Sequence, residues 1–363
     1  MLAVVLRRLQ STRLCSQRFS VANTSFMSKK MSTSTTTVAV ICPEDSPALG
    51  ALDGKVPAGA KLIIANTLES FVSHEDFPNV NSLMFVAAGG DVALLPQLYD
   101  RCSNIEWVHS LFAGVDALAP FIASHLIRDH VPLTNGRGAF SDSLAEYAMA
   151  VALHFNKKIT KIQANTAAKR WDKFVMPTLA GKTMGFLGFG HIGQTTARMA
   201  KALGMNIIAL RKNPGNTDCI GLADMTYGLD DKLKVFQESD FVVSVLPGTP
   251  ETLDFCGAAE FQSMKNDAIF ISIGRGLVVD EDALAAAVQS GTIAGAALDV
   301  FKTEPLPSES KLWACGDDVL LTAHNADYTE EYFQLGWDVW RRNYDSFRDG
   351  KGFLTLVDKT LGY

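Results

Sequence analysis

Short apolar runs rich in β-branched residues alternate with stretches of helical periodicity along most of the chain, from about residue 37 to residue 324. Such alternation favours parallel sheets that are covered by helices on both faces. It occurs in two series, and 363 residues are enough for two domains, so we predict an α/β protein with two doubly wound domains. The predicted strands are residues 36–42, 60–66, 82–88 and 105–112 in the first series, and 182–190, 205–210, 239–247, 267–274, 291–300 and 318–324 in the second.

The predicted helices differ in length. Residues 92–102 keep helical spacing around an internal Pro96, and residues 279–291 form another helical pattern. Residues 141–171 begin with Ser and Asp as candidate caps and are typical of one long helix, which we expect to bridge the two domains. A last long helix is predicted after His324 and is expected to return to the first domain.

The first 36 residues differ from the rest in composition. They contain six basic residues and no acidic one, and they are rich in Ser and Thr. This composition is typical of a mitochondrial or chloroplast transit peptide, and the alternative is a disordered tail without an address. We predict the mitochondrial matrix, or the cytoplasm when translation begins at Met27 or Met31.

The composition also excludes several classes of protein. At 47% hydrophobic and 20% charged residues the chain is ordinary for a globular protein, and no apolar run approaches the ~18 residues of a membrane span. A net charge of −6 offers no basic face to nucleic acid. The six cysteines form no C-x-x-C pair and lie at no metal-ligand spacing from a histidine, so we predict reduced thiols and no metal site.

A glycine-rich motif, "GFLGFGHIGQ", follows the first strand of the second series and precedes a helical stretch. Gly188 allows a tight turn, Gly190 lets a pyrophosphate approach the backbone, and Gly193 lets helix and strand pack closely. The following helix N-terminus offers N–H groups to phosphates. The motif therefore predicts a dinucleotide site in a Rossmann-type domain; the alternative is a glycine-rich turn that binds nothing.

Three side chains with complementary chemistry follow three strands of the second series. Arg275 follows "AIFISIG", Glu304 lies beyond "AGAALDVF", and His324 follows "VLLTA". Any one of them could be an ordinary solvent-exposed residue, but the carboxyl ends of parallel strands share one edge. A guanidinium can hold a carboxylate in two-pronged fashion, and a histidine can transfer a proton near neutral pH. A carboxylate bonded to that histidine favours its protonated form and fixes its orientation. Together they suit hydride transfer to a 2-keto acid.

From about residue 105 to residue 327 the chain resembles the D-isomer-specific 2-hydroxyacid dehydrogenases. The resemblance lies in the motifs "AGVDAL", "LAEYAMAVAL", "LAGKTMGFLGFGHIG", "VLPGTPETLDF", "MKNDAIFISIGRGLVVDEDAL" and "AGAALDVFKTEPLP". It implies a flavodoxin-like substrate domain with an inserted Rossmann nucleotide-binding domain, a homodimer, and an active site in the cleft between the domains. We place the substrate domain at 37–143 plus 326–363 and the NAD(P)-binding domain at 144–325.

The resemblance also implies roles for individual residues. Arg275 matches the arginine that orients the substrate, His324 matches the catalytic histidine, and Glu304 matches the acid that supports it. Ala113 and Gly114 match the loop whose amides hold the substrate carboxylate, although a plain turn is the alternative.

Further residues are predicted to contact the cofactor. Asp299 matches the residue that meets the nicotinamide carboxamide, or else it caps a neighbouring helix. Leu246 and Pro247 match the loop beside the nicotinamide ring, and Thr252 is expected to bond a phosphate or to cap the following helix. Four more residues within or beside these motifs complete the predicted cofactor site: His191, Ile192, Ile273 and Gly274.

The chain departs from the family pattern at two places. The histidine stands in "AHNAD", so Asn325 and Asp327 add polar groups beside it, where the family has small apolar residues. Phe112 replaces a residue that is commonly small, and its ring is expected to shrink or reshape the substrate pocket.

Two cations end the second strand of the Rossmann series. Arg211 falls where NAD-dependent enzymes commonly carry an acid for the ribose hydroxyls, and Lys212 follows it. A guanidinium can bind a 2′-phosphate, which an acid would repel, so we predict that NADP(H) is preferred and NAD(H) is the alternative cofactor. The other interpretation is that both cations end the strand in solvent.

The predicted function is reduction of a small 2-keto acid, such as glyoxylate or hydroxypyruvate, to its D-2-hydroxy acid. The competing hypothesis is a dinucleotide-sensing scaffold of the same fold that resembles a co-repressor. Turnover with a panel of 2-keto acids distinguishes the two.

Overall fold

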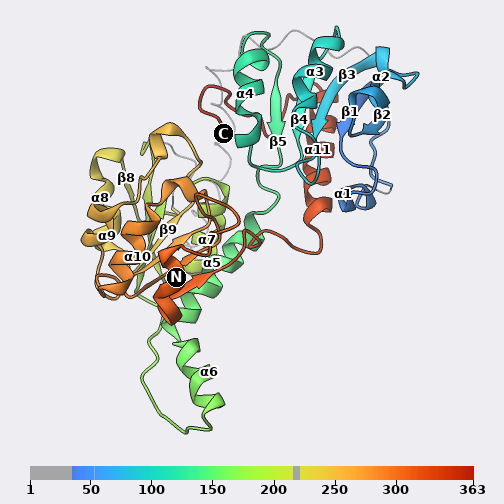
Figure 1. The fold of residues 1–363 in the computed structure, drawn as a ribbon. Coiled ribbons are helices and arrows are strands. Elements are labelled where there is room, and N and C mark those ends of the chain that lie inside the picture. The colour runs from blue at the N-terminus through green and yellow to red at the C-terminus, as the bar shows by residue number, and fades with distance from the viewer. Residues whose placement is uncertain (1–34, 53, 216–220) are drawn as a thin grey trace, which may run out of the picture. The chain divides into compact units, whose positions relative to one another are not determined.

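The structure is a computed structural model that describes residues 35–52, 54–215 and 221–363. The proposed targeting segment, residues 1–36, lies outside the described part except for its last two residues. Two sheets organise the described chain, and every strand pair within them is parallel. The predicted α/β class with two doubly wound sheets is confirmed, and Figure 1 shows the helices flanking each sheet.

The first sheet has the strand order β2-β1-β3-β4-β5, which is the flavodoxin-like order. Its first strand, β1, is buried at every position because "TTVAVI" is a continuous β-branched and apolar run, as central parallel strands require. The strands are β1 (Thr36–Ile41), β2 (Ala60–Ala65), β3 (Val80–Phe85), β4 (Trp107–Ser110) and β5 (Leu133–Asn135). The helices packed with them are α1 (Pro47–Gly50), α2 (Leu68–Val72), α3 (Leu94–Arg101), α4 (Ala119–Phe121) and α11 (Tyr332–Arg348).

The last helix, α11, belongs to this first sheet, as predicted. Its Trp337, Trp340 and Tyr344 are buried in one cluster with Val38 and Val40 of β1. The indole Nε1 of Trp337 also donates to the carbonyl of Ala48 at 2.7 Å. A segment near the C-terminus therefore completes the core of a domain that begins near residue 36.

The second sheet has the order β12-β11-β10-β9-β6-β7-β8, so β6 and β9 are neighbours where the strand order reverses, as in the Rossmann fold. Its strands are β6 (Thr183–Leu187), β7 (Asn206–Leu210), β8 (Met225–Tyr227), β9 (Phe241–Ser244), β10 (Ile269–Ser272), β11 (Gly295–Leu298) and β12 (Val319–Leu321). Its helices are α5 (Ser141–Asn156), α6 (Ile159–Ala167), α7 (His191–Ala202), α8 (Lys232–Glu238), α9 (Ala258–Ser263) and α10 (Glu281–Gln289).

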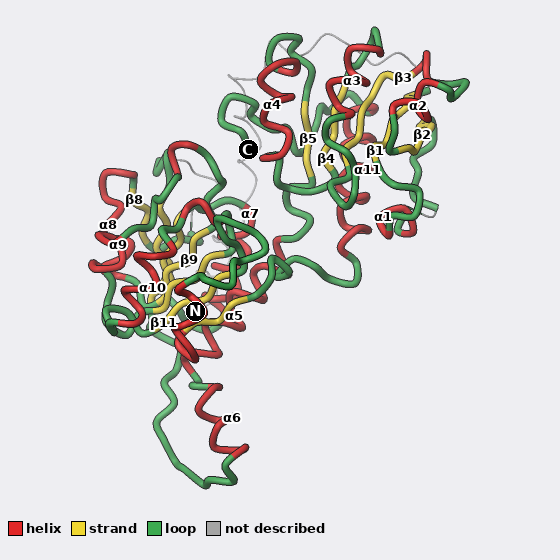
Figure 2. Tube along the Cα trace, in the orientation of Figure 1, coloured by secondary structure: helices red, strands yellow, loops and turns green. Residues whose placement is uncertain are grey.

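The single long helix predicted for residues 141–171 is wrong. The chain forms α5, breaks at Lys158 in the left-handed region (φ 53°), and forms the shorter α6. Ser141 lies inside α5, whose N-cap is Phe140 with no side-chain hydrogen bond, so the expected Ser/Asp cap is also wrong. The chain after α6 returns to β6 as an extended loop (Figure 2).

Candidate active site

The carboxyl edge of the second sheet collects most of the predicted site residues. Strand registers place Leu187 beside Leu210 and Ser244, Ser244 beside Ser272, and Leu298 between Ser272 and Leu321. The segments that follow these strands therefore leave the sheet side by side, at its carboxyl edge. They begin at Gly188, Arg211, Val245, Ile273, Asp299 and Thr322.

The glycine motif adopts the geometry that its three glycines predict. Gly188 has φ 87°, which only glycine adopts without strain, and it turns the chain from β6 toward α7. A side chain on Gly190 would meet no protein atom within 4 Å, whereas one on Gly193 would lie 3.1 Å from the carbonyl oxygen of Gly188. The first turn of α7, which starts with His191 and Ile192, has no side-chain cap. The motif thus leaves an open space beside an uncapped helix N-terminus, which fits a dinucleotide pyrophosphate.

Arg211 and Lys212 follow β7 directly, as predicted. The amide of Arg211 donates to the carbonyl of Tyr227 at 2.9 Å, which continues the pairing of β7 with β8 for one residue. The Arg211 residue is half-buried and Lys212 is exposed. Neither of the two residues at this strand end is acidic.

The loop after β9 packs closely on the turn after β10. A side chain on Gly274 would collide with the backbone of Leu246, so only glycine permits this approach. Pro247 accepts a hydrogen bond from the hydroxyl of Thr252 at 2.7 Å, and the same hydroxyl accepts the amide of Thr249 at 2.9 Å. Thr252 therefore fixes this loop by closing a capping box with Thr249.

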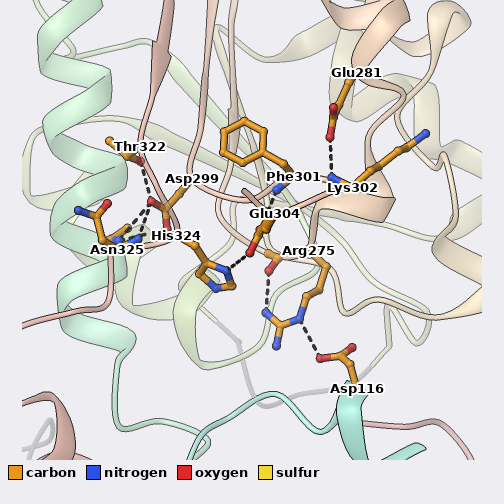
Figure 3. Close-up of polar contacts among 12 residues, drawn as sticks. Asp116, Arg275, Glu281, Asp299, Phe301, Lys302, Glu304, Thr322, His324 and Asn325 are labelled. Atoms are coloured by element: carbon orange, nitrogen blue, oxygen red, sulfur yellow. Dashed lines mark hydrogen bonds and ion pairs between the residues drawn. The ribbon is translucent and has the colours of Figure 1, made fainter. Parts of the chain in front are cut away.

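Arg275 contacts both the turn after its own strand and the first domain (Figure 3). Its Nε donates to Oδ2 of Asp116 at 3.0 Å, and its Nη1 donates to the carbonyl of Gly274 at 2.8 Å. The guanidinium also lies so close to Gly114 that any side chain there would collide with it. The neighbouring carbonyl of Ala113 accepts the amide of the Asn135 side chain at 2.6 Å. The structure therefore brings together the arginine and the loop that were both predicted to bind substrate.

His324 and Glu304 form the predicted pair. The imidazole Nδ1 of His324 lies 2.8 Å from Oε2 of Glu304, while Oε1 of Glu304 accepts the amide of Phe301 at 2.9 Å (Figure 3). The pair is accessible, with 44% of the His324 side chain and 36% of the Glu304 side chain exposed. Because Nδ1 is engaged, Nε2 is the ring atom left for a substrate.

The backbone at His324 is held in an unusual conformation. His324 has φ 49°, in the left-handed region that non-glycine residues rarely adopt. Its amide donates to the carbonyl of Asp299 at 2.8 Å. Backbone strain of this kind persists where surrounding contacts fix it, and it is common at functional sites.

Asp299 makes many of the contacts that hold the backbone at His324, a role that the sequence did not reveal. Its buried carboxylate accepts the hydroxyl of Thr322 at 2.6 Å and the amides of Asn325 and Ala326 at 3.0 and 3.1 Å. The residue therefore caps the turn that carries His324 rather than a neighbouring helix. A polar residue at the end of a buried strand was the available signal.

Asp327 is a further carboxylic acid close to the site, and this residue is half-buried. Burial raises its pKa, while His324 and Arg275 oppose that rise because their positive charges favour the carboxylate. The polar residues of "NAD", where the chain departs from the family pattern, therefore lie close to the site. Asn325 lies in the turn that Asp299 caps, and Asp327 is near enough to His324 and Arg275 for electrostatic interaction.

The described residues offer neither a membrane span nor a metal site. Within residues 35–52, 54–215 and 221–363, no helix is both long and apolar enough to cross a membrane. The same residues contain no group of three or more His, Cys, Asp or Glu side chains placed to hold a metal ion.

Comparison with known proteins places this geometry in context. Residues 149–326 match the family model described as the NAD-binding domain of D-isomer specific 2-hydroxyacid dehydrogenases. The chain is 36% identical over 260 residues to glyoxylate/hydroxypyruvate reductase B of an Enterobacter species, covering 70% of this chain and 77% of that one. It is 34% identical over 274 residues to glyoxylate reductase of Pyrococcus furiosus, covering 73% and 79%.

A solved structure is similar over most of the chain. The D-isomer specific 2-hydroxyacid dehydrogenase of Xanthobacter autotrophicus Py2, in complex with NADPH and MES, superposes with a TM-score of 0.77 at 28% identity. The superposition covers 91% of this chain and 100% of that one.

A Rossmann sheet whose edge carries a histidine–carboxylate pair and an arginine is the arrangement of a nicotinamide-dependent oxidoreductase. The chain belongs to the D-isomer-specific 2-hydroxyacid dehydrogenase family. Membership makes it an NAD(P)-dependent enzyme of D-2-hydroxy acids, as predicted.

Proposed function

We propose that this enzyme reduces small 2-keto acids, with glyoxylate and hydroxypyruvate among its substrates, to their D-2-hydroxy acids at the expense of NADPH. The observation that carries the proposal is the His324–Glu304 pair beside Arg275. The names of the Enterobacter and Pyrococcus relatives support these substrates. The NADPH bound to the Xanthobacter structure supports the cofactor.

In this mechanism Arg275 binds the carboxylate of the 2-keto acid, together with the backbone at Ala113 and Gly114. The close approach of the guanidinium to Gly114 means that one bound anion can contact both. Because a guanidinium is planar, two parallel hydrogen bonds to a carboxylate fix the direction in which the carbonyl points. Arg275 thus sets the orientation of the reacting carbon.

His324 gives its Nε2 proton to the carbonyl oxygen as that oxygen becomes a hydroxyl. Glu304 holds Nδ1 and so keeps the ring in one orientation throughout the transfer. In the reverse direction Nε2 takes the proton from the hydroxy acid. A positioned general acid of this kind is typically worth about 10²–10⁴-fold in rate.

The chain's own residues fit a bound NADP(H), whose nicotinamide supplies or accepts the hydride. Gly188, Gly190 and the first turn of α7 would hold the pyrophosphate, since Gly190 opens onto free space. Arg211 and Lys212 would hold the 2′-phosphate at the end of β7. The close-packed loops around Leu246 and Gly274 would support the nicotinamide end.

Steady-state kinetics with NADPH and a panel of 2-keto acids tests the proposal. His324→Ala is expected to abolish most turnover while leaving cofactor affinity nearly unchanged. Arg275→Ala should raise KM because the guanidinium binds the substrate carboxylate, and should lower kcat because it also orients the carbonyl in the transition state. Purified His324→Ala that turns over like the wild type would refute the catalytic assignment. No turnover of any 2-keto acid by the wild type would favour the scaffold hypothesis.

A homodimer is the proposed assembly, and the arm formed by α6 and residues 168–178 supports it. Figure 1 shows α6 standing out from the other elements around it. Trp171 on this arm is fully exposed, and Val175 and Met176 are also exposed. Exposed apolar residues gathered on one segment commonly mark a protein interface. Sedimentation equilibrium of Trp171→Glu should show monomers, whereas Leu203→Glu, at the exposed residue that follows α7, should sediment like the wild type.

The mitochondrial matrix is the proposed location, on the strength of the acid-free, basic N-terminal composition. Residues 1–36 fused to a fluorescent reporter should carry it into mitochondria. A diffuse cytosolic signal would contradict the proposal.

A further inference from the structure

A cavity of about 650 Å³ opens at the carboxyl edge of the five-stranded sheet. It is lined by Pro43 and residues 45–47 after β1, residues 87–89 after β3, and the rings of Phe112, Tyr328, Tyr332 and Phe333. In the order β2-β1-β3-β4-β5, the gap between β1 and β3 is where the strand order reverses. Open α/β sheets bind ligands at such a point, and the volume lies in the range of small-molecule sites.

The aromatic wall of this cavity is packed as a unit. The rings of Phe112 and Tyr332 are stacked, with centroids 5.2 Å apart and planes 20° apart. Tyr328 and Phe333 meet Tyr332 edge-on, at 5.1 and 5.3 Å. Stacked and edge-on arrangements are the favoured geometries of aromatic pairs, so the wall offers an ordered apolar surface to a ligand.

The chain connects this aromatic wall to the proposed site on two sides. Phe112 immediately precedes Ala113 and Gly114, and Gly114 lies against Arg275. On the other side, Tyr328 follows the turn that carries His324. Tyr332 is also close enough to Arg275 and Asp327 for their charges to influence its pKa, which burial raises. A 2-keto acid held by Arg275 and His324 therefore has the cavity next to its remaining substituent.

The polar groups of the cavity favour a neutral, apolar substituent. The hydroxyl of Ser46 already donates to the carbonyl of Ala88 at 3.3 Å and accepts the amide of Ala48 at 3.4 Å. Asp45 is the one charged residue among the described residues that line the cavity, and it is an acid. A substrate with a second carboxylate would meet repulsion and no cation, whereas an aryl or branched alkyl group would meet the ring wall.

We infer that the preferred substrates are 2-keto acids with a bulky apolar side chain, which occupies the cavity between the β1 and β3 loops and the Phe112–Tyr332 wall. This inference rests on the proposed 2-keto acid reductase function and specifies its substrate class. Glyoxylate and hydroxypyruvate bind the same Arg275 and His324 but leave the cavity to water. Phe112 accordingly forms a wall of the substrate site rather than a plug that confines it to the smallest substrates.

The test is kcat/KM with NADPH for five substrates: glyoxylate, hydroxypyruvate, phenylpyruvate, 4-methyl-2-oxopentanoate and oxaloacetate. Phenylpyruvate and 4-methyl-2-oxopentanoate are expected to exceed glyoxylate by about 10- to 100-fold, the range that burial of such a side chain gives. Oxaloacetate should be the poorest of the larger substrates.

A variant that fills the cavity tests the role of the cavity independently of the catalytic groups. Ala87→Phe adds a ring at a position of the β3 loop that lines the cavity, and it should abolish the advantage of phenylpyruvate over glyoxylate. Ala93→Phe makes the same change at an exposed alanine outside the cavity and should behave like the wild type.

The outcomes distinguish the inference from the function on which it rests. Turnover of glyoxylate at least as fast as phenylpyruvate would overturn the inference and leave the reductase function intact. An advantage of phenylpyruvate that survives Ala87→Phe would also overturn it, because the side chain would then lie elsewhere. Failure of all five substrates would overturn the proposed function itself.

Discussion

His324 Nδ1 lies 2.8 Å from Oε2 of Glu304, and the other oxygen of that carboxylate is anchored by the amide of Phe301 at 2.9 Å. The histidine ring is thus oriented by an acid that is itself oriented by the backbone. Orientation matters here because His324 sits in a left-handed backbone conformation that it would rarely adopt alone. The hydrogen bond to Glu304 therefore fixes the direction in which Nε2 points, on a residue whose backbone is strained.

Glu304→Gln is expected to lower kcat about 10- to 100-fold. The amide keeps the size of the side chain but loses a charged hydrogen bond, worth roughly 1.5–3 kcal/mol when the partner carries charge. Stopped-flow and steady-state rates with NADPH measure the loss, and KM for NADPH should be unchanged. Glu309→Gln, at an exposed acid nearby, is the matched control. Wild-type kcat in Glu304→Gln would mean that the acid has no part in orienting the ring.

The ion pair between Arg275 and Asp116 predicts that substitutions of its two members change KM in opposite directions. Both side chains are partly exposed, at 33% and 49%, so the pair stabilises the fold little. A bound substrate carboxylate must compete with Asp116 for the guanidinium. Asp116→Asn should therefore lower KM for the 2-keto acid about 1.5- to 5-fold, the range that exposed ion pairs give.

Arg275→Lys keeps the positive charge but loses the planar fork, and it should raise the same KM about tenfold or more. Initial-rate measurements on both variants provide the check. A higher KM in Asp116→Asn would show that Asp116 positions Arg275 for the substrate instead of competing with it.

The residues that meet at the sheet edge were predictable because parallel strands bring their carboxyl ends together. Arg275, His324 and the glycines needed only correct strand assignments. The contacts of Asp116 and Asp299 could not be predicted in this way, because their hydrogen-bond partners lie 159 and 23 or more residues away in the sequence. An acid in sequence is compatible with a cofactor contact, an ion pair or a turn cap, and only the fold selects one of these.

The errors in secondary structure also have physical reasons. The strands β5 and β8, each three residues long, were missed, and both lie at the edge of their sheet. Runs that short carry little periodicity. The break at Lys158 was missed because "NKKITK" contains no glycine or proline to stop a helix, and local propensity is overridden by the surrounding structure.

Arg211→Asp is expected to move cofactor preference from NADPH toward NADH, chiefly by weakening NADPH binding. The change removes a cation at the end of β7 and places an acid where a 2′-phosphate would be repelled. Hydrogen bonds to charged groups are worth roughly 1.5–3 kcal/mol, which corresponds to about one to two decades of preference. The measurement is kcat/KM for both cofactors.

Lys212→Asp makes the same charge change one residue further from the strand and should shift the cofactor ratio less. A wild type that prefers NADH, or an unchanged ratio in Arg211→Asp, would show that these cations face something other than the cofactor.

His109 on β4 gives the first domain a sensitivity to acid. The hydroxyl of Thr134 accepts the indole N–H of Trp107 at 2.8 Å and is hydrogen-bonded to Nδ1 of His109 at 2.6 Å. The ring is fully buried, and its Nε2 has no hydrogen-bond partner among the described residues. Burial lowers the pKa of His109 to about 3, because a charged imidazole would lose its hydration there.

The sign of the pH effect follows from that lowered pKa. Below the ordinary value of 6.5, the unfolded chain binds a proton at His109 that the folded chain does not bind. Stability is therefore complete above about pH 6.5 and is lost as the pH falls from there toward 3, by about 2 kcal/mol at pH 5. Urea unfolding at pH 7 and pH 5 should show this loss in the wild type and less of it in His109→Gln, whatever the absolute stability of the variant. His130→Asn, at an exposed histidine with φ 57° that Asn also tolerates, should retain the full difference. An equal loss in His109→Gln and the wild type would assign the acid sensitivity to other groups.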